Sequence, residues 1–198
     1  MTCIIGLMEG DFVYIGGDSA NEVETIGPSM SKVWERKDAG DNRWIFGVGG
    51  YGRNSQLVQE LLDLQELGVN VTNLLHREIY SLLVTKVATR MIEIAEKHSV
   101  TTRDKGGRIL AGCGLTIGVY SSLFRIAGDG GVDSFGTSTR PFTASGSGRP
   151  EALGALCALQ DSSAMGPKER LTRALHVAQE LNPDTVRGPF HIISTKPD

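Results

Sequence analysis

The sequence has no apolar run long enough to cross a bilayer and no block of charge of one sign. Its formal net charge of −3 disfavours nucleic acids and anionic membranes as partners, because both attract a cationic surface. The segment after Met1 also lacks the basic start, the long apolar stretch and the cleavage site of a secretory signal. These absences predict a cytoplasmic protein that binds neither nucleic acid nor membrane.

Cysteine and histidine are few, and their spacing points to no disulfide or metal chemistry. Cys3, Cys113 and Cys157 show no paired spacing and lie in apolar surroundings, which is typical of reduced core residues. The four histidines lie far apart in the chain, without the spacing of metal ligands. The sequence therefore predicts neither a disulfide framework nor a metal site.

No Pro/Ser-rich tether and no internal repeat divides the chain, so residues 1–198 are predicted to form one domain. Leucines at helical spacing predict a helix from about residue 57 to a stop at Gly68. A longer helix is expected over residues 72–98, and two amphipathic helices over residues 151–159 and 168–181.

Apolar runs bounded by turn residues predict the strands. They are expected at residues 2–7, 12–16, 44–48, 113–120, 123–127 and 190–194, with a further strand that ends at Ala144. Because strands cluster with strands and helices with helices, the sequence predicts an α+β fold, a four-layer α-β-β-α sandwich.

The segment Gly47-Val48-Gly49-Gly50-Tyr51-Gly52 matches the G-x-G-x-x-G pattern of dinucleotide-binding folds. That pattern requires an acidic residue about 20 positions later, at the end of the next strand. This distance falls at residues 68–72, between two predicted helices. A tight strand-to-helix turn is therefore favoured over a dinucleotide site, and no cofactor is predicted. The exposed N–H groups of such a turn can also hold an oxyanion.

The run Cys3-Ile4-Ile5-Gly6-Leu7 indicates a buried strand with Thr2 at its tip. A threonine hydroxyl becomes a nucleophile only when a nearby base takes its proton. Removal of Met1, which a small second residue favours, would leave an α-amine on Thr2 that titrates near neutral pH and can be this base.

Three further residues complete the chemistry that an N-terminal threonine needs. A neighbouring ammonium would lower the pKa of the amine, and a carboxylate would hold that ammonium in place. Lys32 and Asp18 are the candidates for these two roles. Gly49, in the glycine-rich turn, is the candidate N–H donor to the tetrahedral oxyanion.

The sequence also resembles that of a known family. The motifs that carry the resemblance are "TCIIGL", "DFVYIGGDSA", "SKVW", "WIFGVGG", "ASGSGRPEALGALCAL" and "PFHII". They are similar to those of proteasome-type β subunits, and most of all to the bacterial HslV kind, over nearly the whole chain. Thr2 and Asp18 keep the family's spacing of sixteen residues, and Lys32 precedes an apolar residue as the family's lysine does. The resemblance implies an N-terminal nucleophile (Ntn) hydrolase with an α-β-β-α sandwich.

The resemblance also assigns residues that the chemistry alone does not. The family's oxyanion glycine falls on Gly49, and its site serine, in an "SG" before a helix, falls on Ser147. Gly47 and Tyr51 match positions that line the family's primary specificity pocket. One departure concerns an Asp and a Ser near the last strand of proteasomal subunits, because Arg187 stands where the Ser is expected.

The expected function is therefore that of a threonine-type endopeptidase or amide hydrolase, with Thr2 exposed by removal of Met1. The resemblance implies a self-compartmentalised homo-oligomer, a peptide or unfolded protein as substrate, and an ATP-dependent unfoldase as a partner. The alternative is a catalytically silent proteasome-like scaffold or assembly subunit. A less favoured hypothesis is a dinucleotide-binding enzyme that uses Gly47, Gly49 and Gly52.

Overall fold

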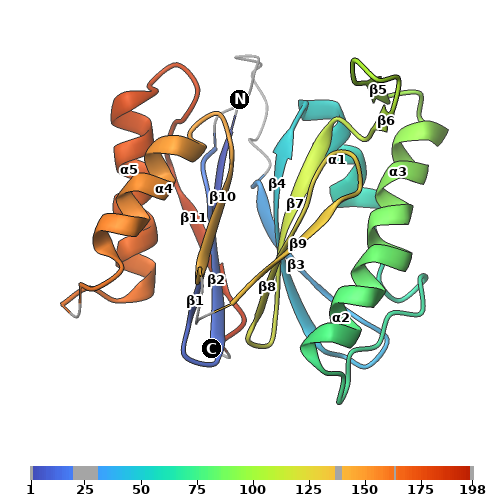
Figure 1. Cartoon of the computed structure of the whole chain (residues 1–198), viewed down its shortest axis with the longest axis horizontal. Coiled ribbons are helices and arrows are strands. Elements are labelled where there is room, and N and C mark those ends of the chain that lie inside the picture. Colours follow the sequence, from blue (N-terminus) through green and yellow to red (C-terminus); the bar gives the residue numbers. More distant parts are fainter. Residues whose placement is uncertain (1, 20–30, 137–139, 163, 197–198) are drawn as a thin grey trace.

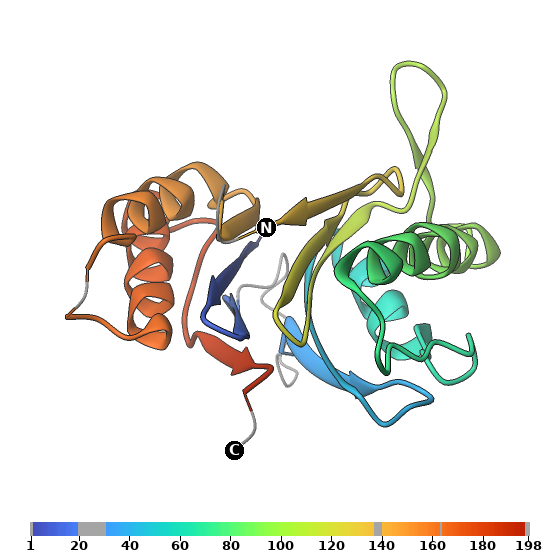
Figure 2. The ribbon, with the colours of Figure 1, turned by 60° about the horizontal axis from the view of Figure 1, so that its bottom comes forward.

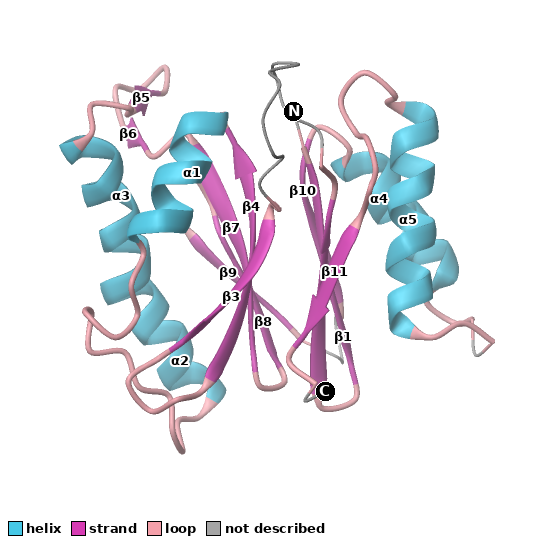
Figure 3. Ribbon diagram, turned by 180° about the vertical axis from the view of Figure 1, so that it is seen from behind, coloured by secondary structure: helices cyan, strands magenta, loops and turns pink. Residues whose placement is uncertain are grey.

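Two antiparallel sheets face each other in the middle of the molecule, and helices cover the outer face of each sheet (Figure 1 and Figure 3). The computed structural model describes residues 2–19, 31–136, 140–162 and 164–196. The four-layer α-β-β-α sandwich predicted from the sequence is confirmed.

The first sheet carries the N-terminal strand in its interior, in the order β10-β1-β2-β11. Its strands are β1 (Cys3–Glu9), β2 (Phe12–Gly17), β10 (Phe142–Gly146) and β11 (His191–Ser194). β1 and β2 form an antiparallel hairpin, and β1 also pairs with β10, from far along the chain. Helices α4 (Arg149–Leu159) and α5 (Pro167–Leu181) cover the outer face of this sheet.

The second sheet has the order β3-β4-β7-β8-β9. Its strands are β3 (Val33–Lys37), β4 (Arg43–Gly50), β7 (Cys113–Val119), β8 (Ser122–Ile126) and β9 (Val132–Phe135). Its outer face is covered by α1 (Gly52–Leu61), α2 (His76–Leu82), the π-helical segment η1 (Leu83–Val87) and α3 (Ala88–Lys97). A two-stranded hairpin of β5 (Thr102–Arg103) and β6 (Ile109–Leu110) follows α3.

Glycines set the distance between the two sheets. Ile4 and Val13 belong to a buried cluster in the layer between them. A Cβ on Gly47 would lie 2.5 Å from Cγ2 of Ile4, and a Cβ on Gly118 would lie 2.7 Å from Cγ1 of Val13. A larger residue at either position would push the sheets apart, so these glycines allow the start of β1 to lie beside the end of β4.

The helix predicted from residue 57 to Gly68 is wrong at both ends. It begins at Gly52 and ends at Leu61, because the carboxylate of Asp63 accepts the N–H of Gln65 at 2.7 Å and starts a turn. Leu64 is fully buried inside that turn, so the leucine spacing continues past the end of the helix. Gly68, with φ +59°, lies in the same turn and not at the helix end.

The remaining differences are smaller. The helix expected over residues 72–98 begins at His76, where the N–H of Leu75 donates to Oε2 of Glu78 at 2.7 Å. It then continues through η1 to Lys97. The strand expected to end at Ala144 extends to Gly146. No helix within the described ranges is long and apolar enough to cross a membrane.

Candidate active site

Thr2 lies just before β1, beside Gly49 near the end of β4 in the opposite sheet. Along β1, Cys3 packs toward the helices of the first sheet and Ile4 packs into the layer between the sheets. Because side chains alternate along a strand, Thr2 shares the Ile4 face. A Cβ on Gly49 of β4 would lie 3.2 Å from Cγ2 of Thr2. Thr2 is buried, with 4% of its surface exposed, so the fold holds its side chain against the end of the opposite sheet.

Asp18 is a fully buried carboxylate that follows β2 and bonds to the start of β1. The N–H of Cys3 donates to Oδ1 of Asp18 at 2.9 Å, and the N–H of Asp18 donates to the Cys3 carbonyl at 3.2 Å. Nζ of Lys32 lies 3.1 Å from Oδ1 and 3.3 Å from Oδ2 of the same carboxylate. A buried charge requires such partners, because burial without them is strongly unfavourable.

Lys32 directly precedes β3 of the second sheet, so the Asp18–Lys32 ion pair connects the two sheets beside the start of β1. The side chain of Lys32 is 11% exposed and that of Asp18 is 0% exposed. The carbonyl of Lys32 accepts the N–H of Val48 at 2.9 Å, which fixes the backbone of Lys32 to β4. The ammonium is therefore held at a defined place next to the backbone of the residue that follows Thr2.

Ser147, just beyond β10, clamps the backbone of Thr2. The N–H of Thr2 donates to Oγ of Ser147 at 3.3 Å, and this hydroxyl donates to the Thr2 carbonyl, also at 3.3 Å. The clamp depends on Gly146, which has φ +89°. A Cβ on Gly146 would lie 2.0 Å from the Thr2 carbonyl oxygen, so only glycine allows β10 to approach Thr2 this closely.

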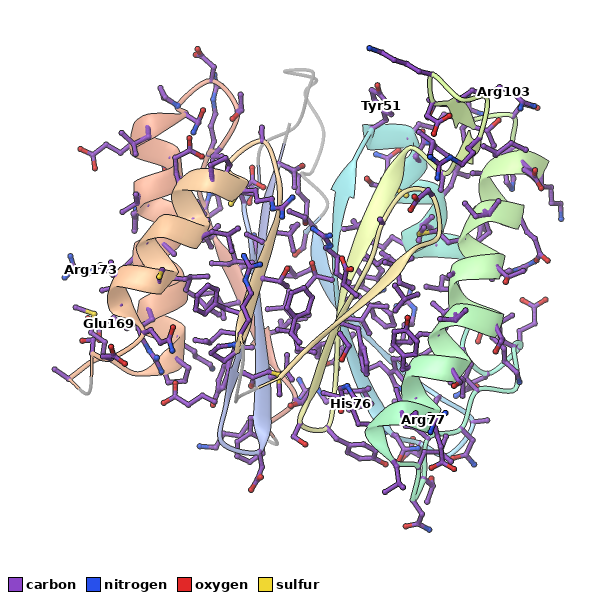
Figure 4. All side chains as sticks on the ribbon, in the orientation of Figure 1. Tyr51, His76, Arg77, Arg103, Glu169 and Arg173 are labelled. Atoms are coloured by element: carbon purple, nitrogen blue, oxygen red, sulfur yellow. The ribbon has the colours of Figure 1, made fainter. Side chains whose placement is uncertain are left out.

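The structure brings Thr2, Asp18, Lys32, Gly49 and Ser147 together, although they come from positions spread over 145 residues. Tyr51 lies two positions past Gly49, as the residue before α1, with 57% of its surface exposed (Figure 4). Gly47 is placed differently, because its Cα faces Ile4 and Ile15 in the layer between the sheets. That position has a clear packing role, and a contribution of Gly47 to substrate binding stays a prediction.

Cys3 lies next to Thr2 but is poorly suited to be the nucleophile. Burial, and secondly the negative charge of Asp18, raise the pKa of the Cys3 thiol to about 12. Since the thiolate is the reactive form, this thiol is inert near neutral pH. The hydroxyl of Thr2 is therefore the better candidate nucleophile at this end of the sandwich.

The dinucleotide interpretation of the glycine-rich segment does not fit the sheet around it. Gly47 and Gly49 lie within β4, and β4 is antiparallel to both of its neighbours, β3 and β7. A dinucleotide fingerprint requires a parallel βαβ unit, with the helix crossing over to the next parallel strand. The segment forms the strand-to-helix turn that the sequence favoured, with Gly50 at φ +153° against the backbone of Cys113.

Sequence reasoning missed one residue that shapes this end of the fold. Asn54, in the first turn of α1, is 6% exposed, and its Nδ2 donates to the carbonyls of Val100 at 2.7 Å and Ala111 at 2.6 Å. The only signal in the sequence is a polar Asn at a position where a helix buries its face. Within the described residues, no group of three or more His, Cys, Asp or Glu is arranged to hold a metal ion.

No protein-family model and no curated protein sequence matches this chain. Solved structures do match it along its whole length. BPH from Thiobacillus denitrificans is 16% identical over 100% of both chains, with a TM-score of 0.74, and another structure shows BPH in complex with epoxomicin. HslV from Trypanosoma brucei is 19% identical over 98% of both chains, with a TM-score of 0.60. Anbu from Pseudomonas aeruginosa, seen as a helical assembly, is 18% identical over 98% of this chain and 80% of its own, with a TM-score of 0.67.

These matches establish the class of fold. The chain has the HslV-like, proteasome-type fold of N-terminal nucleophile hydrolases, as the sequence motifs implied. At 16–19% identity the likeness defines the fold alone, and the chemistry must be argued from the residues of this chain.

Proposed function

We propose that the chain is a threonine-type peptidase or amide hydrolase whose nucleophile is the hydroxyl of Thr2. The observation that carries the proposal is the buried Asp18–Lys32 ion pair, hydrogen-bonded to the backbone of Cys3 directly after Thr2. A buried ion pair contributes little to stability compared with apolar packing. Its placement at the tip of β1 is explained by a need for a fixed positive charge beside Thr2.

In this proposal, removal of Met1, which lies outside the described residues, leaves Thr2 with a free α-amine. The ammonium of Lys32 disfavours a second positive charge nearby and so lowers the pKa of the amine. More of the amine is then neutral at pH 7 and able to accept the proton of the Thr2 hydroxyl. Asp18 is a positioning residue here, because it acts through Lys32 and through the Cys3 N–H.

The reaction follows from these roles. Oγ of Thr2 forms a bond to the substrate carbonyl carbon while its proton passes to the amine, and the N–H of Gly49 stabilises the oxyanion. The C–N bond then breaks, and the leaving amine takes the proton from the ammonium of Thr2. Water attacks the resulting ester with the same amine as base, which releases the acid and restores Thr2. Ser147 orients the Thr2 backbone throughout.

The proposed substrate is a peptide or an unfolded protein segment, because the sequence motifs resemble those of HslV-type subunits. A homo-oligomer is proposed on the precedent of the Anbu helical assembly. An ATP-dependent unfoldase is the proposed partner, since a site enclosed in such an assembly would admit only unfolded chain.

The first test is the intact mass of the purified protein before and after treatment with epoxomicin, a peptide epoxyketone that reacts with a hydroxyl and a free α-amine on one residue. We expect loss of Met1 and one adduct per chain, located on Thr2 by peptide mapping. Thr2→Ala should form no adduct and should lower peptide turnover at least 10³-fold, because it removes the nucleophile.

Thr2→Ser is the matched control, since it keeps a hydroxyl and should keep both the adduct and measurable turnover. A chain that retains Met1 and forms no adduct would contradict the proposal and support the catalytically silent scaffold. Turnover by Thr2→Ala equal to that of the unchanged chain would remove Thr2 as the nucleophile.

A further inference from the structure

The hairpin of β5 and β6, residues 101–110, projects from the body of the molecule beyond the end of α3 (Figure 2). Its turn is held by Asp104, whose carboxylate accepts the N–H of Gly106 at 2.8 Å and of Arg108 at 2.9 Å. Nη1 of Arg103 donates to the Gly107 carbonyl at 2.8 Å. These bonds within the hairpin make it a defined arm.

The base of the hairpin is fixed to the segment that carries Gly49 and Tyr51. The amide of Asn54 bonds the carbonyls of Val100 and Ala111, the residues on either side of the hairpin. The N–H of Tyr51 donates to the carbonyl of Gly112 at 3.0 Å. One buried amide and one backbone bond thus connect the hairpin to the end of β4, where Gly49 borders Thr2.

The hairpin is basic in an acidic chain. Arg103, Lys105 and Arg108 are exposed, and Asp104 is the one acidic residue among residues 101–110. The hairpin therefore carries a net charge of +2, which leaves −5 on the rest of the chain. Since Asp104 is engaged with the turn and with Nε of Arg108, the side of the hairpin away from it presents cationic groups to solvent.

We propose that this hairpin is a substrate-recognition arm that selects peptides with acidic side chains on one flank of the cleaved bond. The inference rests on the proposed function and adds a substrate class to it. Because Tyr51 follows Gly49 and its N–H bonds to Gly112 at the hairpin base, we place one flank of a peptide bound between Thr2 and Gly49 along Tyr51, toward the hairpin. Figure 4 shows Tyr51 and Arg103 at the same end of the molecule.

The reach of the arm sets where the acidic residue must lie. Tyr51 lies two positions after Gly49, and Arg108 lies three positions before Ala111 at the hairpin base. The cationic groups therefore lie beyond Tyr51, several substrate residues from the scissile bond. An acidic residue at that distance is therefore recognised, and one directly beside the scissile bond is not recognised by the hairpin.

The test compares paired fluorogenic peptides that differ only by Glu or Gln, at one to seven residues from the cleaved bond and on either flank. We expect a Glu/Gln ratio of kcat/KM of roughly ten at positions several residues from the cleaved bond, on one flank only, and a ratio near one directly beside the bond. The ratio should fall to about one in the variant with Arg103→Gln, Lys105→Gln and Arg108→Gln, and in 0.5 M salt, which screens exposed charges. A ratio of one at every position in the unchanged chain would overturn the inference.

Arg77→Gln and Arg173→Gln are matched controls, since each removes one exposed cation from a helix away from this end (Figure 4). Both should keep the full Glu/Gln ratio. Lys105→Glu is the second variant, because it reverses charge without touching the Arg103 and Arg108 contacts that shape the hairpin. It takes the net charge of the hairpin from +2 to 0, so it should lower the ratio toward one, and a ratio left at ten would also overturn the inference.

A binding measurement separates this inference from the proposed hydrolysis. Thr2→Ala is titrated with a fluorescein-labelled Gly/Ser peptide carrying three Glu, and with its three-Gln counterpart, by fluorescence anisotropy. Tighter binding of the Glu peptide that is lost in the triple hairpin variant supports the arm even if the chain hydrolyses nothing. Equal binding of both peptides, with a change in oligomer mass in the triple variant, would assign the hairpin to a contact between copies instead.

Discussion

Asp18 is the residue whose environment constrains the site most tightly. Its carboxylate is fully buried, at the junction of two sheets, and receives a backbone N–H from β1 and an ammonium from the residue before β3. Cys3 begins β1 directly after Thr2. The backbone of Lys32 is bonded to β4, whose Gly49 lies beside Thr2. The position of the positive charge of Lys32 is therefore set by the fold rather than by the rotamer freedom of a long side chain.

Replacing Lys32 by alanine tests the proposed role of its charge in lowering the pKa of the Thr2 amine. Without the ammonium, the pKa of the Thr2 amine is expected to rise, since a neighbouring positive charge no longer opposes protonation. Turnover at pH 7 should fall at least 10²-fold, and the rising limb of the pH–rate profile should move to higher pH. Steady-state kinetics from pH 5 to 9.5 measures both.

Lys37→Ala is the matched control for that experiment. Lys37 lies in β3 with its side chain 60% exposed and paired with Asp41 at the surface, so its removal should leave the profile in place. If Lys32→Ala kept the pH–rate profile of the unchanged chain, the proposed tuning of the amine would be wrong.

The sequence singles out residues with chemical meaning more readily than the residues that position them. Thr2, Asp18 and Lys32 stand out because a terminal hydroxyl, a carboxylate and an ammonium have a joint chemical meaning at a recognisable spacing. Gly146 and Asn54 carry no such meaning alone. Their roles depend on a positive φ and on two carbonyls that are distant in sequence, and such contacts exist only in three dimensions.

In the second sheet, the interior strands were predictable from the sequence and the two edge strands were not. β1, β2, β4, β7 and β8 contain the apolar runs that indicate a strand. β3 and β9 are the two edges of the second sheet, and their sequences, VWERK and VDSF, carry charged residues. Charge on an edge strand protects it from pairing with another chain but weakens the apolar signal.

The connection between α1 and the hairpin makes a prediction at the scale of elements. Asn54→Ala removes both bonds to the hairpin base and leaves the buried Ala111 carbonyl without that donor, which should lower the free energy of unfolding by about 2 kcal/mol. Hydrogen exchange should become faster in residues 100–111 in particular. Urea unfolding and exchange mass spectrometry measure the two effects.

Gln56→Ala is the control on the same helix, because Gln56 is exposed and its loss should change neither quantity. Protection of residues 100–111 that is unchanged in Asn54→Ala would show that the hairpin is held by other contacts.

For the whole molecule, the separation of the sheets is the quantity on which the site depends. Gly47→Ala would place a methyl group 2.5 Å from Cγ2 of Ile4 and 3.0 Å from Cγ2 of Ile15, both in the packed layer between the sheets. Overpacking of this kind should cost about 1–3 kcal/mol of stability. It should also lower turnover, because Thr2 and Gly49 lie on opposite sheets and move apart.

Gly52→Ala provides the comparison, since an added Cβ there meets nothing within 4 Å and stability should be unchanged. Thermal unfolding and kcat/KM measured on the same preparations distinguish packing from recognition. A loss of substrate affinity in Gly47→Ala without any loss of stability would favour the specificity-pocket role that the sequence resemblance implied.

The contact between Thr2 and Ser147 also sets an order of events during biosynthesis. The two residues are 145 positions apart, so the clamp on Thr2 cannot form until most of the chain has left the ribosome. At about 5–20 residues per second, that interval lasts roughly 7–30 seconds. During this interval the backbone of Thr2 is not yet held by Ser147. If Met1 is removed as proposed, an aminopeptidase has that time to act before the contact between Thr2 and Ser147 forms.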